Sequence, residues 1–99
     1  MKVATEQYMY TLPIGRENAV HQQDLCRRWG VNARTVRAII EELRLGGAFI
    51  VTGQEGYYLT DDPEEIEAYV RKKRAEAYSI LRMLTPMRRY LLDRKKGKK

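Results

Sequence analysis

Apolar residues recur at helical spacing in two neighbouring segments of the chain, 22–29 and 33–45. In the first segment the apolar side holds Leu25, Cys26 and Trp29. In the second segment the apolar positions are Val36, Ile39, Ile40 and Leu43, and the opposite face carries Arg34, Thr35, Arg37, Ala38, Glu41 and Arg44. This pattern predicts two short amphipathic helices, each with one face in a core.

The residues between and after these segments predict where the helices end and begin. Gly30 favours the left-handed conformation that closes a helix, and Val31 can fill the corner that follows. Asn32 is a good N-cap because its side chain accepts a hydrogen bond from a free backbone N–H. Gly46 and Gly47 are expected to stop the second helix.

The chain before this pair predicts less regular structure. We expect a short first helix over residues 5–12, capped by Thr5, with Tyr8, Met9 and Leu12 on its apolar side. Pro13 should end it. Residues 14–18 are then expected to be a loop and residues 19–20 a very short strand.

After Gly47 the period changes from helical to extended. Residues 49–51 are β-branched or aromatic, residues 53–56 (GQEG) have turn composition, and residues 57–60 (YYLT) are a second extended run. This arrangement predicts a two-stranded hairpin directly after the second helix.

Residues 61–65 (DDPEE) are typical of a helix start, with an Asp cap, a proline in the first turn and acidic side chains near the positive end of the helix dipole. We expect a helix from residue 63 to about residue 92, kinked or divided by Pro86. The basic residues 93–99 are expected to be a disordered tail.

The long helix carries a stripe whose members follow alternating steps of four and three residues, as in a coiled coil. The stripe consists of Ile66, Val70, Lys73, Ala77, Ile80, Leu84, Met87 and Leu91, and all but the lysine are apolar. One interpretation is a helix that lies across its own domain. We favour homodimerisation through the seven apolar members, because a chain of this size has little core with which to cover them.

The pair of helices resembles the helix-turn-helix family. The family has a small residue four positions before the turn glycine, where Cys26 lies, and apolar residues on both sides of it, where Trp29 and Val31 lie. It also has branched apolar residues six and nine positions after the glycine, which are Val36 and Ile39 here. The alternative is an ordinary helical hairpin in a small core.

The order of elements resembles the winged-helix branch of that family. The segment GQEGYYL is similar to the wing of the N-terminal module of biotin-ligase repressors, and GRENAV at residues 15–20 is similar to small winged-helix proteins of prophages and Gram-positive bacteria. The resemblance covers roughly residues 5–62 and implies a mainly α fold with a small β-hairpin wing (α+β). Together with the stripe and the basic tail, it divides the expected chain into a DNA-binding domain (residues 1–62), a dimerisation helix (63–92) and a disordered tail (93–99).

The resemblance also implies double-stranded DNA binding, with the helix at residues 33–45 in the major groove, and a role in transcriptional regulation, with a phage or mobile element as one setting. Arg34 and Arg37 are then expected to contact bases or phosphates. The full set of expected DNA-binding residues is Gln22, Gln23, Arg27, Asn32, Arg34, Thr35, Arg37, Ala38 and Glu41. The wing tip departs from the family because it carries Gln54 and Glu55 and no basic residue.

Charge and composition refine this interpretation. The 99 residues have a formal net charge of +6, but residues 1–62 hold seven basic and eight acidic side chains, and residues 63–99 hold twelve and five. DNA binding by the first part therefore requires local placement of arginines. One cysteine and no segment long enough for a membrane span lead us to expect a cytoplasmic protein.

The remaining chemistry is sparse. His21 has no neighbours at metal-ligand spacing, and Cys26 takes the place of a small core residue. We expect no enzyme activity, no metal and no cofactor. The alternative functions are a protein-interaction or assembly module, or a replication or excision accessory factor that uses the winged helix as a binding scaffold.

Overall fold

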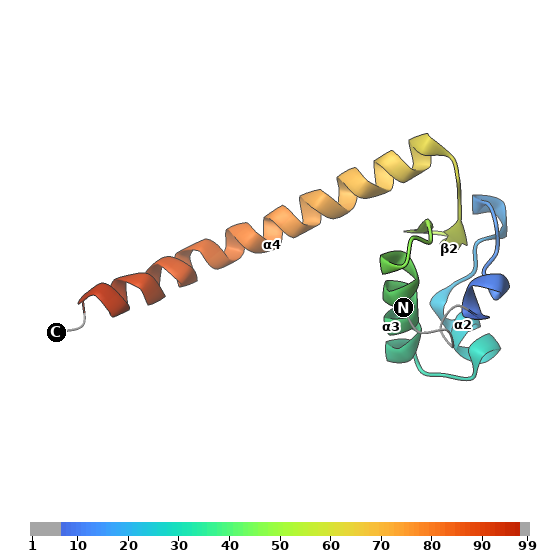
Figure 1. Cartoon of the computed structure of the whole chain (residues 1–99), viewed down its shortest axis with the longest axis horizontal. Helices are drawn as coiled ribbons and strands as arrows, with labels where there is room; N and C mark the ends of the chain where they lie inside the picture. Colours follow the sequence, from blue (N-terminus) through green and yellow to red (C-terminus); the bar gives the residue numbers. More distant parts are fainter. Residues whose placement is uncertain (1–6, 98–99) are drawn as a thin grey trace. The chain divides into compact units, whose positions relative to one another are not determined.

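The computed structural model describes residues 7–97 of the chain (Figure 1). The elements in order are the 3-10 helices η1 (Gln7–Thr11) and η2 (Arg16–Asn18), the helices α2 (Gln22–Trp29) and α3 (Ala33–Leu45), the strands β1 (Ile50–Gly53) and β2 (Gly56–Leu59), and the helix α4 (Pro63–Gly97). The described chain is thus mostly helical with one small antiparallel sheet, as the α+β expectation states. It divides into two units, Met1–Glu67 and Ala68–Lys99.

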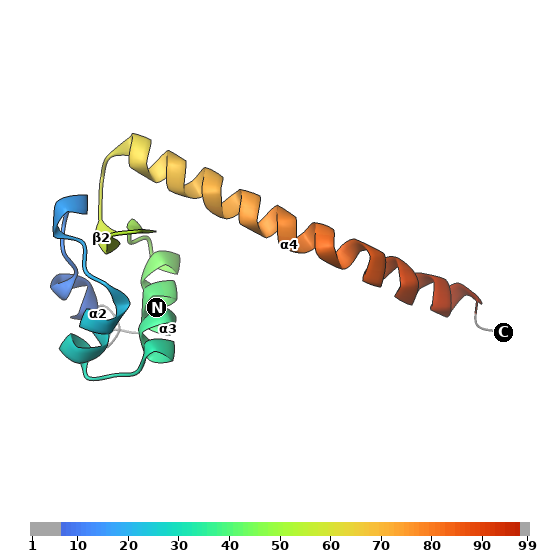
Figure 2. The ribbon, with the colours of Figure 1, turned by 180° about the vertical axis from the view of Figure 1, so that it is seen from behind.

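The core of the first unit forms between α2, α3 and the hairpin, and α2 and α3 lie side by side in both ribbon views (Figures 1 and 2). The predicted apolar positions of α3 are all buried, and Leu25 of α2 is fully buried. Burying each such side chain contributes about 1.5–3 kcal/mol, so this cluster is the main stabilising feature of the unit. Its members are Leu12, Leu25, Val36, Ile39, Ile40, Leu43 and Ile50.

The first helix differs from the prediction. Residues 7–11 of the predicted helix over 5–12 form a 3-10 helix, residue 12 lies beyond its end, and the expected cap Thr5 lies outside the described residues. Trp29 explains why so short a helix is held in position. Its indole Nε1 donates to Thr11 Oγ1 at 2.7 Å, and its ring lies 4.8 Å from that of Tyr8, centroid to centroid.

The turn between α2 and α3 is confirmed residue by residue. Gly30 is left-handed, with φ 68°, and the N–H of Val31 donates to the carbonyl of Cys26 at 3.1 Å. Asn32 caps α3, because its side-chain oxygen accepts from the N–H of Thr35 at 2.8 Å. The cap and the left-handed glycine together fix the direction in which α3 leaves the turn.

The predicted hairpin is also present, with a two-residue turn at Gln54 and Glu55. Ile50 pairs with Leu59 and Gly53 pairs with Gly56. Residues 49 and 60 of the predicted runs lie outside the strands.

A third segment pairs with the hairpin and ties it to the start of α2. The N–H of Tyr57 donates to the carbonyl of Val20 at 2.7 Å, and the N–H of Val20 donates back at 3.1 Å. The expected strand at 19–20 is therefore a single antiparallel bridge. Gly56 allows this approach, since a Cβ at this position would lie 2.2 Å from the carbonyl oxygen of Val20.

The start of α4 is anchored within the first unit. The carboxylate of Asp62 accepts from the N–H of Glu64 at 3.0 Å, as expected of an N-cap. Glu65 accepts from the hydroxyl of Thr60 at 2.6 Å and lies 3.4 Å from the guanidinium of Arg16. Charge interactions raise the pKa of Arg16 above its ordinary value; the largest is with Tyr58 and the next is with Glu65.

The remainder of α4 corrects two expectations. The helix is continuous through Pro86 and is not divided there. It also continues to Gly97, so the prediction of a disordered tail is wrong for residues 93–97, while residues 98–99 lie outside the described range. Next to the proline, the Thr85 hydroxyl donates to the carbonyl of Leu81 at 3.3 Å.

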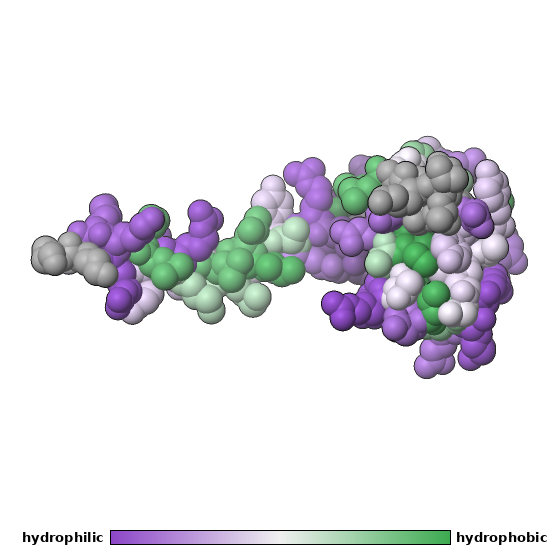
Figure 3. Space-filling model, turned by 60° about the horizontal axis from the view of Figure 1, so that its bottom comes forward, coloured by the Kyte–Doolittle hydropathy of each residue, from purple (hydrophilic) through white to green (hydrophobic). Residues whose placement is uncertain are grey.

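None of the described residues of α4 is buried. Figure 3 shows hydrophobic side chains gathered along the middle of this helix, with hydrophilic ones toward its end. Among the described helices, none is long and apolar enough to cross a membrane.

Candidate nucleic-acid interface

The outer face of α3 is an exposed surface of the first unit. Arg34, Arg37, Ala38 and Glu41 are exposed and Thr35 is half-buried. Their spacing of three and four residues places them along one side of the helix. The opposite side is buried in the core, so the backbone that carries these side chains is held firmly.

The two arginines on this face differ in their surroundings. A nitrogen of the Arg37 guanidinium donates to Oε1 of Gln22 at 3.5 Å, which is a long contact between the second turn of α3 and the first residue of α2. No hydrogen bond or ion pair joins the Arg34 side chain to another residue in the range 7–97. Both guanidinium groups therefore retain donors for a ligand.

Of the predicted residues of α2, Gln22 is joined to this face through its contact with Arg37. Gln23 is exposed. Arg27 is exposed but forms a short ion pair with Asp24, one turn earlier on the same helix. That carboxylate offsets the charge of Arg27, so this residue adds less to an anion-binding surface than its exposure suggests.

Two arginines form hydrogen bonds to other elements of the first unit that the helical pattern did not predict. Arg44 was placed on the outer face of α3, but its guanidinium donates to the carbonyl of Ile50 at 2.9 Å and to the hydroxyl of Thr52 at 2.8 Å. It fastens the last turn of α3 to β1 and is not part of the exposed face. Arg28 is exposed, and it donates to the carbonyl of Thr11 at 3.0 Å.

Asn32 has a definite role beside this face. Its side-chain oxygen is used in capping α3, so its effect on a ligand is to position the first turn that bears Arg34. The remaining N–H groups of that turn lie at the positive end of the helix dipole, where an anion is favoured.

The hairpin tip contributes no positive charge. Gln54 and Glu55 are exposed, and β1 and β2 contain no basic side chain. A carboxylate at this position opposes a phosphate, so the hairpin supports α3 from the core side through Ile50 and Arg44 and offers no cationic contact of its own.

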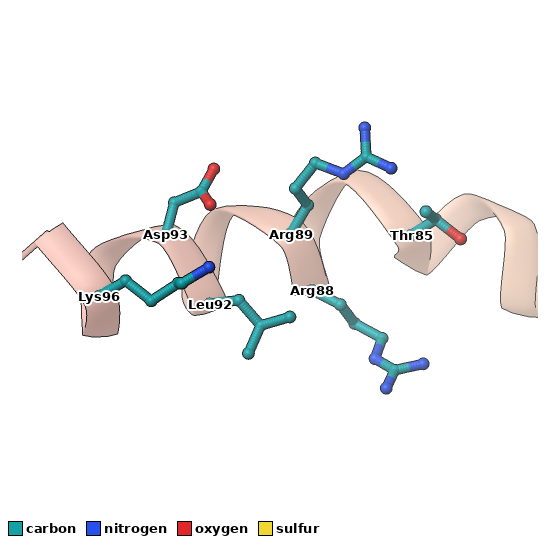
Figure 4. Close-up of a pocket in the computed structure, with 6 residues that line it drawn as sticks. All are labelled: Thr85, Arg88, Arg89, Leu92, Asp93 and Lys96. Carbon is teal, nitrogen blue, oxygen red and sulfur yellow. The ribbon is translucent and has the colours of Figure 1, made fainter.

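An open hollow lies on α4 and is lined by residues of that helix alone (Figure 4). Arg89 and Asp93 point to one side of the helix, and Arg88 and Leu92 point to the other. In the described part of the chain, no residue outside α4 lines the hollow, so it lacks the enclosure of a small-molecule site. Among residues 7–97, no group of histidine, cysteine and carboxylate side chains is placed to hold a metal ion.

Comparison of the chain with protein-family profiles, with curated proteins and with solved structures found no match. The geometry and charge of the α3 face are therefore the observations from which a function can be inferred.

Proposed function

We propose that this protein binds double-stranded DNA by placing the outer face of α3 in the major groove. The observation that carries the proposal is the combination on one supported helix of two exposed arginines, Arg34 and Arg37, a small exposed residue, Ala38, and a firmly buried opposite face. In this proposal the first unit is a winged helix-turn-helix.

The dimensions of α3 suit this role. Its 13 residues make a rod of about 20 Å, and the major groove is wide enough to admit an α-helix. The residues that meet base edges in such docking come from the first turns of the helix. Arg34, Thr35 and Ala38 lie in those turns.

The chemistry of the face suits bases as well as phosphates. An arginine fork donates two parallel hydrogen bonds to the edge of guanine, or to phosphate oxygens. Ala38 allows close approach and can contact a thymine methyl group. Glu41 can accept a hydrogen bond from cytosine, and Gln22 and Gln23 can donate to the DNA backbone.

The proposed setting is transcriptional regulation by a homodimer. The exposed apolar stripe of α4 is the proposed contact between the two copies, because a single copy leaves it uncovered. Two copies would then bind a palindromic or repeated DNA site.

The proposal is tested by titrating labelled duplex DNA with the full chain at several salt concentrations. The sequence of the duplex is found first, by selecting the duplexes that the protein binds from a random pool. Arg34→Ala and Arg37→Ala are each expected to weaken binding by about 1–3 kcal/mol if the side chain reads a base, and to relax the preference at one position. If the side chain contacts a phosphate, binding to all sequences weakens equally and the slope of log Kd against log salt becomes smaller.

Arg16→Ala is the matched control, since it removes one positive charge from the same unit at a residue engaged by Glu65. It should leave the affinity close to that of the unaltered chain. The proposal is wrong if the three variants bind DNA equally well, because binding would then reflect total charge and the basic side chains of α4.

A further inference from the structure

The steps between successive members of the α4 stripe form the same series when they are counted from either end of the helix. The steps are four, three, four, three, four, three and four residues from Ile66 to Leu91. If a second copy of the helix lies against it in the opposite direction, every member meets another member. The facing pairs are Ile66 with Leu91, Val70 with Met87, Lys73 with Leu84, and Ala77 with Ile80.

We infer that two copies of the chain pair through α4 in an antiparallel orientation, in the register that sets Val70 of each copy against Met87 of the other. The inference rests on the pairing proposed above and is independent of DNA binding. Most of the apolar members are exposed and so available for this contact, while Ile66 is half-buried. Val70, Ile80, Met87 and Leu91 are 47%, 53%, 63% and 61% exposed.

The charge at the two ends of α4 favours this orientation over a parallel one. Residues 63–69 contain three glutamates and no basic side chain, and residues 88–96 contain five basic side chains and one aspartate. Parallel pairing sets like charges against each other at both ends. Antiparallel pairing sets the acidic end of each copy beside the basic end of the other, at both ends of the pair.

Lys73 favours the same orientation. In a parallel pair in register, each member of the stripe faces its own equivalent, so the two Lys73 ammonium groups would meet in the seam. In the antiparallel register Lys73 faces Leu84. Its ammonium is already drawn to the edge of the stripe, 3.3 Å from a carboxylate oxygen of Glu76 and 5.5 Å from the centre of the Tyr69 ring. Its aliphatic stem can then cover Leu84.

The positions that flank the stripe add a specific ion pair. In the antiparallel register Glu67 of each copy faces Arg88 of the other, and the same contact occurs twice by symmetry. The flanking pairs of a parallel dimer join no opposite charges. They are Tyr69 beside Arg74, Glu76 beside Leu81, and Met83 beside Arg88.

Disulfide cross-linking tests orientation and register together. In a Cys26→Ala background, Val70→Cys and Met87→Cys are prepared separately and also co-expressed, and each sample is mildly oxidised. Antiparallel pairing places position 70 of one copy about 25 Å along the axis from position 70 of the other. The separate variants should therefore stay uncross-linked, and the co-expressed pair should give a covalent dimer. Cross-linking within a separate variant would overturn the orientation.

Two further measurements complete the test: the mass of the protein in solution, and the dimer Kd of variants in which the charges of Glu67 and Arg88 are reversed. The unaltered chain should sediment as a dimer without DNA, and a monomer at micromolar concentration would contradict both pairing and orientation. Glu67→Arg and Arg88→Glu should each raise the dimer Kd about fivefold, and the double variant should restore it. Arg89→Glu is the control, because it makes the same charge change one residue away on the outer side of α4, and it should raise the dimer Kd clearly less than Arg88→Glu does. Failure of the double variant to restore the dimer would overturn the register.

Discussion

At the scale of single residues, Gly56 decides how the hairpin meets the rest of the first unit. Its φ of 115° lies in the region that only glycine adopts without strain, and its Cα faces the backbone of Val20 at close range. A side chain at this position would clash with main-chain atoms of Val20, and these atoms cannot move away without breaking the pairing with Tyr57.

Gly56→Ala is therefore expected to lower the free energy of unfolding by about 2 kcal/mol or more, since it adds both a positive-φ penalty and a backbone clash. Chemical denaturation followed by tryptophan fluorescence measures the loss, because Trp29 is packed on the same core. Gly53→Ala is the control. Its nearest contact is a flexible side-chain atom of Glu55 at 3.4 Å, and it should change stability far less.

Arg44 shows why helical periodicity alone misplaces a residue. Counting along α3 puts it on the outer face with Arg34 and Arg37, but the chain after Gly47 folds back and brings Ile50 and Thr52 within reach of its long side chain. Nothing in the spacing of α3 contains that information, because the contact depends on how the hairpin docks.

Arg44→Ala should consequently separate stability from DNA affinity. It removes two part-buried hydrogen bonds and is expected to lower the free energy of unfolding by about 1–3 kcal/mol. Under conditions where the variant remains folded, its affinity for DNA should match that of the unaltered chain. The reverse result, a stable protein with weakened DNA binding, would place Arg44 in the interface.

At the scale of elements, the sequence predicted those that local chemistry determines. The left-handed Gly30, the Asn32 cap, the bounds of α3 and the place of the hairpin turn all depend on residues within a few positions. The turn itself is shorter than predicted, because Gly53 and Gly56 pair with each other as strand residues. η1 depends on Trp29, which lies 18 residues after Thr11, and its 3-10 form was not predicted.

Helix α4 is longer than predicted because the basic composition of residues 93–97 was taken to indicate a disordered tail, and it is undivided although Pro86 favours a kink or a break. Proline removes one backbone donor, and its ring crowds the carbonyl four residues earlier, but the turns on each side retain their own bonds. Basic side chains in the last turns are also favoured by the negative end of the helix dipole, so residues 94–96 support the helix.

Pro86→Ala is expected to strengthen α4 by up to about 3 kcal/mol, the usual difference between proline and alanine inside a helix. Thermal melting followed by far-ultraviolet circular dichroism should show a higher midpoint for the helical signal. Since residue 86 lies outside the stripe, the dimer Kd should fall or stay unchanged. A lower midpoint would mean that the proline has a stabilising contact with the second copy.

At the scale of the whole molecule, the charge is divided between residues 1–62 and residues 63–99, which have different proposed roles. The first part of the chain is nearly neutral, and the second holds the excess of basic residues. The sequence predicted the exposed face of α3 correctly, apart from Arg44, because burial follows helical period. The binding partner of this face could not be predicted from the same pattern. An arginine that contacts DNA must be exposed, but an arginine that contacts only solvent is exposed as well.

The most direct measurement of the central claim is a map of which amides respond when the full chain binds DNA. Nitrogen-15-labelled protein is titrated with a selected duplex, and the shift of each backbone amide is followed by nuclear magnetic resonance. We predict that the largest shifts cluster at residues 22–23 and 32–41, with smaller salt-sensitive shifts in α4. Shifts confined to α4, or centred on the hairpin tip at Gln54 and Glu55 with α3 unaffected, would contradict the proposal that α3 is the DNA-binding helix.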